Sequence, residues 1–164
     1  EVNLTRLVGD VVDEIAQQPP RRQIDFSVKK MKPCLADEGL IKQAFVNLVS
    51  NAVKFTRNRD VATIEIGTTT SKPRLENGNY GEKTPCYYVR DNGVGFDMRF
   101  YDKLFGVFQR LHSIEDYEGT GVGLAIVKRV VEKHGGIVWA ESVLNLGTTF
   151  YFTLGEENTN DRSD

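Results

Sequence analysis

The chain has 164 residues and a formal net charge of −2, with 40% hydrophobic and 27% charged residues. This length allows one compact domain, and the composition is typical of a globular protein of the α/β or α+β class. The charge balance provides no basic face for a polyanion, which makes nucleic acid and membrane surfaces poor candidates for partners. Since the sequence contains neither a long apolar run nor a signal-peptide pattern, we expect a cytoplasmic location.

The N-terminal half predicts two amphipathic helices separated by two short strands. Apolar residues recur at helical spacing from Leu4 to Ile15 behind a potential Asn3 cap, and this helix should end near QQPP at residues 17–20. Alternating patterns in QIDFSVKK (23–30) and KPCLAD (32–37) predict strands. Asp37 should open the second helix, whose apolar stripe consists of Leu40, Ile41, Ala44, Phe45, Leu48, Val49 and Ala52.

The C-terminal half predicts four strands, one helix and a long irregular segment. VATIEIGTTT (61–70) and CYYVRD (86–91) read as two long adjacent strands joined by a surface connection. Residues 96–118 show no continuous element, and a segment of this kind within a compact domain is usually a functional lid. A helix from Thr120 to about His134 should end at Gly135-Gly136, before the strands IVWAES (137–142) and GTTFYFTL (147–154). The last residues, 156–164, form a polar tail or linker.

The first polar cluster lies on the second predicted helix. Asn47 and Asn51 are one turn apart and Lys54 follows three residues later, so the three side chains share one face. On its own, such an asparagine pair is more typical of a solvated face or of a satisfied core amide. Next to an anionic ligand, one amide oxygen can be the single protein ligand of Mg²⁺, whose other ligands are phosphate oxygens and water. Lys54 suits a phosphate contact.

The second cluster is RDNGVGFD, in which Asp91 ends a strand and Gly93 and Gly95 follow. An ordinary Asp-Asn-Gly turn is one interpretation. Alternatively, a carboxylate at the buried end of a strand would accept a hydrogen bond from the exocyclic amine of adenine. It would oppose the carbonyl of guanine, and such unpaired polar groups discriminate strongly between ligands.

Two further segments contain glycine or aromatic residues. EGTGVGLAIVK (118–128) has three glycines at alternate positions before a helical run, but it lacks the Gly-Lys-Ser/Thr ending of a P-loop and does not follow a strand. Backbone amides at the start of such a helix would suit a phosphate. In KLFGVFQRLH (103–112), Phe105 and Phe108 fit core positions, and Arg110 is a candidate to contact a terminal phosphate.

Four segments, NLVSNAVKFT, DNGVGFD, FGVFQRL and GTGVGLAIV, resemble in this order the N box, first glycine box, phenylalanine box and second glycine box of sensor histidine kinases. The similarity is to the ATP-binding catalytic domain, covers nearly the whole chain and is strongest to phytochrome-type kinases. It implies a two-layer α/β (α+β) sandwich: a mixed, mostly antiparallel sheet of about five strands with three main helices on one face. The catalytic domain would span residues 1–155 and its ATP lid about 96–120.

The resemblance implies Mg-ATP as the ligand and assigns a role to each box. Asn51 would bind Mg²⁺, Asp91 the adenine amine, and Asn47, Lys54 and Arg110 would be the catalytic residues at the phosphates. The other expected ATP-binding residues are Phe55, Gly93, Gly95, Phe108, Gly119, Thr120, Gly121, Val122, Gly123, Leu124 and Thr148.

The implied reaction is transfer of the γ-phosphate to a histidine, with a response regulator acting further along the pathway. In the acceptor pattern an acidic residue follows the histidine, whereas here Ser113 follows His112 and Gly135 follows His134. We therefore expect the acceptor histidine in a separate, upstream dimerisation domain.

Two alternatives remain open at this stage. An ATP-hydrolysing member of the same superfamily would have a glutamate at the position of Asn47, and asparagine is a poor general base. A non-catalytic nucleotide-binding or interaction module would be expected to lose box residues, and no box here is visibly damaged.

Overall fold

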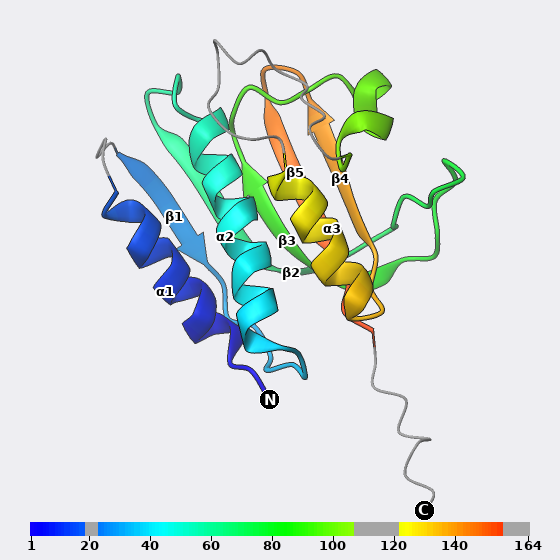
Figure 1. The fold of residues 1–164 in the computed structure, drawn as a ribbon. Coiled ribbons are helices and arrows are strands. Elements are labelled where there is room, and N and C mark those ends of the chain that lie inside the picture. The colour runs from blue at the N-terminus through cyan, green and yellow to red at the C-terminus, as the bar shows by residue number, and fades with distance from the viewer. Residues whose placement is uncertain (19–22, 107–121, 156–164) are drawn as a thin grey trace, which may run out of the picture.

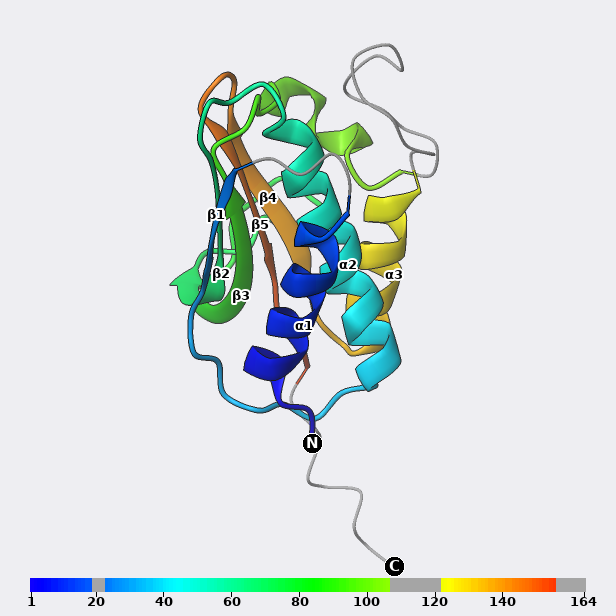
Figure 2. The same ribbon diagram turned by 90° about the vertical axis from the view of Figure 1, so that its left-hand side faces the viewer.

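The computed structural model describes residues 1–18, 23–106 and 122–155, and in this part the chain forms one sheet covered by helices on one face (Figure 1). The elements are α1 (Leu4–Ala16), β1 (Ile24–Val28), α2 (Glu38–Phe55), β2 (Ala62–Ser71), β3 (Thr84–Asp91), the 3-10 helix η1 (Met98–Lys103), α3 (Gly123–Lys133), β4 (Val138–Val143) and β5 (Gly147–Phe152). The strand order is β1-β2-β3-β5-β4. Seen edge-on, the sheet and the three α-helices form two layers, as the sequence predicts (Figure 2).

Two helical crossovers carry α2 and α3 across the sheet. β1 pairs in parallel with β2, and α2 connects them; the other strand pairs are antiparallel. β5 lies between β3 and β4, so α3 returns the chain past β5 to the sheet edge. The last residue of β3, Asp91, is paired with Thr148 beside the β4–β5 turn. That turn and the C-terminal end of α2 lie at the same end of the molecule, opposite the N-terminus (Figure 1).

The predicted helix boundaries are set by side-chain and glycine caps. The Asn3 side chain accepts a hydrogen bond from Arg6 N (3.1 Å), and the Asp37 side chain accepts one from Leu40 N (3.0 Å), so each satisfies an unpaired amide of the first helical turn. α3 is followed by Gly135, whose φ of +73° is the left-handed conformation that glycine adopts without strain. These three boundaries are confirmed.

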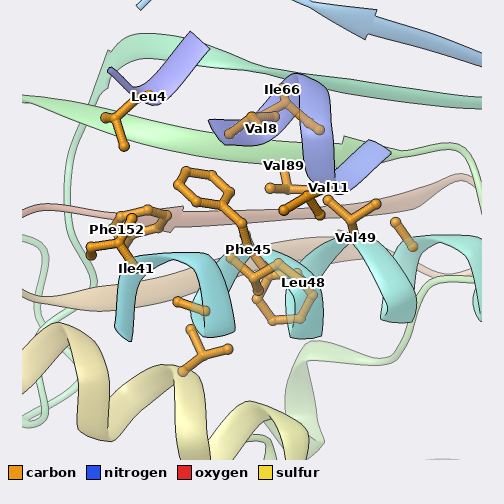
Figure 3. Close-up of a cluster of buried hydrophobic side chains, with 14 of the residues drawn as sticks. Leu4, Val8, Val11, Ile41, Phe45, Leu48, Val49, Ile66, Val89 and Phe152 are labelled. Carbon is orange, nitrogen blue, oxygen red and sulfur yellow. The ribbon is translucent and has the colours of Figure 1, made fainter. Parts of the chain in front are cut away.

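The hydrophobic core fills the space between the two layers (Figure 3). Phe45 of α2 is fully buried and meets Phe152 of β5 edge to face, with ring centroids 5.4 Å apart. Burial of a ring of this size stabilises the fold by about 3 kcal/mol. Because most of the predicted α2 stripe faces this core, the opposite faces of the helix remain available for polar side chains.

Two parts of the fold differ from, or extend, the sequence-based prediction. Residues 32–37 do not form the predicted strand, because only Cys34 pairs, in a single bridge with Val2 (Val2 N to Cys34 O, 2.7 Å). Pro33 has no amide hydrogen to donate, and Asp37 already caps α2, so these residues cannot continue a ladder of strand hydrogen bonds.

The first part of the expected lid contains the 3-10 helix η1. Phe96 and Leu104 in this part are each only 6% exposed.

Among residues 1–18, 23–106 and 122–155, no helix combines the length and apolar character needed to cross a membrane.

Candidate functional site

A buried carboxylate lies at the end of β3. Asp91 is 6% exposed, and its Oδ1 accepts hydrogen bonds from Gly93 N (2.8 Å) and Thr148 N (3.3 Å). Burial raises the pKa of Asp91 from 3.8 to about 6, although the two N–H donors act in the opposite direction. Within the described part of the chain both hydrogen bonds reach Oδ1, which leaves Oδ2 as the oxygen that can accept from a ligand.

Two glycines allow the loop after β3 to pass between α2 and β4. A Cβ on Gly93 would lie 2.3 Å from the carbonyl oxygen of Phe55, and Val94 N donates to the same oxygen at 2.9 Å. Gly95 has a φ of +65°, and a Cβ there would lie 2.2 Å from Val143 O. Larger residues at either position would push the loop away from the end of α2 and alter the surroundings of Asp91.

Thr148 of β5, whose amide also donates to this carboxylate, contacts Ser142 of β4 through its hydroxyl. The Ser142 hydroxyl donates to Gly147 O (3.0 Å) and accepts from Phe96 N (2.8 Å), while its oxygen lies 2.8 Å from Thr148 Oγ1. The Ser142 hydroxyl has a single proton, which it donates to Gly147 O. Thr148 Oγ1 must therefore be the donor in the contact between the two hydroxyls. Lone pairs of Thr148 Oγ1 therefore remain for a ligand next to Asp91.

A second group of site residues forms where α2 meets the start of α3. Asn47 Nδ2 donates to Gln43 O (2.9 Å), and Asn47 Oδ1 would lie 3.1 Å from a Cβ on Gly123. The N-cap residue of α3, Val122, makes no side-chain capping bond. Val122 therefore leaves the first amides of α3 uncapped, and such amides at the positive end of a helix dipole suit an anion.

The remaining predicted residues fall into two sets. Asn51, Lys54 and Phe55 are half-buried in the last turns of α2, between the Asn47 contact and the loop that follows Asp91, and Leu124 is half-buried near the start of α3. The other five lie outside the described residues: Phe108, Arg110, Gly119, Thr120 and Gly121. The described candidates thus lie together at one end of the domain. The other five residues are outside the part of the chain that the structure describes.

The residues around α2 fit a magnesium ion carried by a nucleotide better than a resident metal. In the described ranges, no group of three or more His, Cys, Asp and Glu side chains could hold a metal ion. Mg²⁺ prefers oxygen ligands and keeps several waters, so one amide oxygen from Asn51 together with phosphate oxygens would form a typical set.

A surface pocket of about 480 Å³ lies away from this group, at the β4 edge. It is bordered by the β2–β3 connection, η1 and α3, and contains none of the candidates expected from the sequence. It has no buried carboxylate, so we place the candidate site at Asp91.

Sequence reasoning missed three residues that shape the site. Gly147 has a φ of +135°, and a Cβ there would lie 2.1 Å from Asp91 O. Its place at the start of the predicted GTTFYFTL strand gave a weak signal for this turn. The strand alternation could have placed Ser142 on the face of Thr148. Arg59 follows the N box by only three residues, but nothing in the sequence links it to residues 92, 93 or 145.

Comparison with known proteins places these observations in a family. Residues 36–158 match the model described as "Histidine kinase-, DNA gyrase B-, and HSP90-like ATPase". The chain is 44% identical over 120 residues to cyanobacterial phytochrome A of Nostoc sp. strain PCC 7120, covering 73% of this chain and 14% of that protein. It therefore spans about a seventh of the length of this curated relative.

Two solved structures share the fold. The mycobacterial sensor histidine kinase MprB superposes with a TM-score of 0.71 at 21% identity, over 93% of this chain and 95% of the other. Full-length ShkA, solved in complex with AMPPNP, superposes with a TM-score of 0.66 at 28% identity, over 92% of this chain and 29% of the other.

Proposed function

The chain belongs to the family of histidine kinase-, DNA gyrase B- and HSP90-like ATPases, and on this premise we propose that it binds Mg-ATP and phosphorylates a histidine on a separate domain. The relatives are phytochrome-type and other sensor histidine kinases, so nucleotide binding follows from the family itself. The metal, the acceptor and the individual roles of the residues are parts of the proposal.

The observation that carries the proposal is the buried carboxylate of Asp91. Its Oδ1 is held by two backbone amides, and among the described residues no donor is recorded to Oδ2, which in the proposal accepts from the ligand. Adenine presents an exocyclic amine to such an oxygen, whereas guanine presents a carbonyl. Thr148 Oγ1 and the glycine loop complete the adenine end of the proposed site.

The phosphate end is assigned to the region where α2 meets α3. The amides at the start of α3 would bind phosphate oxygens, with Asn47 and Lys54 beside them and Asn51 holding Mg²⁺. Mg²⁺ supplies charge neutralisation on the phosphates when it is bound. Of the residues outside the described part, we assign Arg110 to the terminal phosphate and Phe108, Gly119, Thr120 and Gly121 to the same site.

Phosphoryl transfer requires positioning and charge stabilisation more than covalent chemistry from this domain. A nitrogen of the acceptor histidine forms a bond to the γ-phosphorus while the bond to the bridging oxygen breaks, and ADP leaves. The Asn47 amide cannot take a proton from water, and its Nδ2 is already bonded to Gln43 O. Rapid ATP hydrolysis is therefore not expected.

The proposal extends to the organisation of the protein. Residues 1–155 form the catalytic domain with a lid at about 96–120, and residues 156–164 a tail or linker. The acceptor histidine belongs to a dimerisation domain of the same protein, a response regulator takes the phosphate further, and the location is cytoplasmic, where ATP is available.

The test compares the 164-residue chain alone with the intact protein that the proposal requires, in which this chain is joined to the acceptor domain. Calorimetry should detect Mg-ATP binding to the chain alone. With γ-labelled ATP, the intact protein should gain an acid-labile phosphohistidine, and the isolated chain should gain no label. Label in the isolated chain, or no binding at millimolar ATP, would contradict the proposal.

A further inference from the structure

Arg59 connects three segments that surround the candidate adenine site. It lies in the turn between α2 and β2, is half-buried, and points its guanidinium at backbone carbonyls. Nε donates to Asn92 O (2.8 Å), and Nη2 donates to Gly93 O (3.0 Å) and to Asn145 O. One side chain thus holds both the loop after β3 and the β4–β5 turn.

The two loops are also bonded to each other and to the sheet. Asn145 has a φ of +67°, and its amide donates to Val94 O at 2.6 Å. The Asn92 side chain bonds the loop after β3 to the start of β2. Its Oδ1 accepts from Thr63 N (2.9 Å) and its Nδ2 donates to Val61 O (3.0 Å). Arg59 supplies the bonds that join these separate contacts into one unit.

The chemistry of this position favours arginine over other donors. Three carbonyl oxygens that converge on one point repel each other, and the planar guanidinium provides a charged fork with several donors in fixed directions. A lysine would supply charge, but not the fork. The peptide groups of residues 92 and 93 are therefore held in one orientation.

That orientation bears directly on the carboxylate. Gly93 O is bonded to Arg59, and Gly93 N donates to Asp91 Oδ1 at 2.8 Å, so both polar groups of Gly93 are fixed. Loss of the hydrogen bond from Arg59 to Gly93 O would let the backbone of Gly93 rotate. The Gly93 N–H would then no longer hold Oδ1, and Oδ2 would lose its direction toward the ligand.

We propose that Arg59 is a positioning residue for base recognition, which orients the Asp91 carboxylate through Gly93 and thereby sets selectivity for adenine over guanine. This rests on the proposed function. Arg59 touches no ligand in the proposal and acts only through the loop backbone.

The first test needs no nucleotide. Amide hydrogen exchange is measured by NMR in the wild-type chain, in Arg59→Met and Arg59→Lys, and in Arg6→Met as a control at an exposed arginine of α1. We expect the Gly93 and Asn145 amides to exchange at least about tenfold faster in both Arg59 variants. The Val89 amide, in the middle of β3, should be unchanged, and Arg6→Met should match the wild type.

The second test measures base selectivity by calorimetry with Mg-ATP and Mg-GTP. Both Arg59 variants should lower the ratio of GTP to ATP dissociation constants by about tenfold or more, because the carboxylate no longer meets the amine in a fixed direction. A merely structural residue would weaken both nucleotides equally. In Asp91→Asn, adding Arg59→Lys should change the ratio no further, since residues acting through one contact are not additive.

The outcomes separate this inference from the proposed function. Unchanged exchange at Gly93 and unchanged selectivity in Arg59→Lys, which preserves the charge, would overturn the role of Arg59. A wild-type chain that binds no nucleotide would overturn the proposed function, and selectivity would then have no meaning. In a chain that does bind nucleotide, faster exchange at Gly93 with unchanged selectivity would support the backbone role of Arg59 and refute the step to selectivity.

Discussion

Replacing Asp91 by asparagine should stabilise the nucleotide-free protein while it weakens ATP binding. The side chain keeps its shape, and the new Oδ1 can accept from Gly93 N and Thr148 N as before. What disappears is a buried negative charge. Proteins commonly retain such destabilising groups where function needs them.

The magnitude follows from the pKa of Asp91. The folded-state value of about 6 lies above the ordinary value of 3.8, so the folded protein binds the proton more tightly than the unfolded chain. Ionisation of Asp91 therefore lowers the free energy of unfolding as the pH rises from about 4 to about 6, and the loss is complete above that range. At about 1.4 kcal/mol per pKa unit, the upper limit of the loss is about 3 kcal/mol.

The assay is urea unfolding followed by circular dichroism at two pH values. At pH 7.5, Asp91→Asn should raise the free energy of unfolding by about 1–3 kcal/mol, and at pH 4 the gain should nearly vanish. Asp13→Asn, at an exposed position of α1, serves as control and should change the free energy by less than about 0.5 kcal/mol at either pH. A destabilised Asp91→Asn protein, or a gain of equal size at both pH values, would refute the reasoning.

The same variant should lose ATP affinity for a geometric reason. Because Oδ1 is committed to two amides, the asparagine Nδ2 must take the place of Oδ2 and would meet the adenine amine donor to donor. We expect the dissociation constant for ATP to rise by about tenfold to a hundredfold. The affinity for GTP relative to ATP should rise, since Nδ2 can donate to the guanine carbonyl.

Two further predictions concern the glycine loop and the metal. Gly93→Ala would place a Cβ 2.3 Å from Phe55 O and should lower the free energy of unfolding by about 2 kcal/mol or more, together with ATP affinity. Gly9→Ala in α1, where a Cβ meets nothing within 4 Å, should instead stabilise by about 0.5–1 kcal/mol, and urea unfolding compares the two. Asn51→Ala should weaken ATP binding in the presence of Mg²⁺ but not in EDTA; an equal loss in both buffers would remove Asn51 from the metal site.

The sequence predicted the elements well where local chemistry decides them. The alternation in residues 61–70 and 86–91 predicted two adjacent strands, which are antiparallel in the structure, and the Asn3 and Asp37 caps set the starts of α1 and α2. The start of α3 is Gly123 rather than Thr120, and the segment around Cys34, where alternation suggested a strand, forms a single bridge. A strand needs a partner opposite several consecutive residues, and among the described residues only Val2 pairs with this segment.

Part of the candidate site followed from the order of the boxes, and part did not. The motifs around Asn47 and Asp91 could be assigned to a nucleotide because the resemblance supplied a template. Residue types and spacing alone also allowed a solvated helix face and an ordinary turn. Their described residues lie at one end of the domain. The roles proposed for these residues in binding stay predictions for the experiments above.

What the sequence alone determined was the periodicity, the caps and the family. These depend on residues that are neighbours along the chain or on motifs that can be matched as text. Only the tertiary structure decided that Asp91 is 6% exposed with a pKa raised to about 6, and that Ser142 and Gly147 support it. It also brought Arg59 against the carbonyls of residues 92, 93 and 145. The partners of Arg59 lie 33, 34 and 86 residues away along the chain, and no local pattern encodes contacts between segments so far apart.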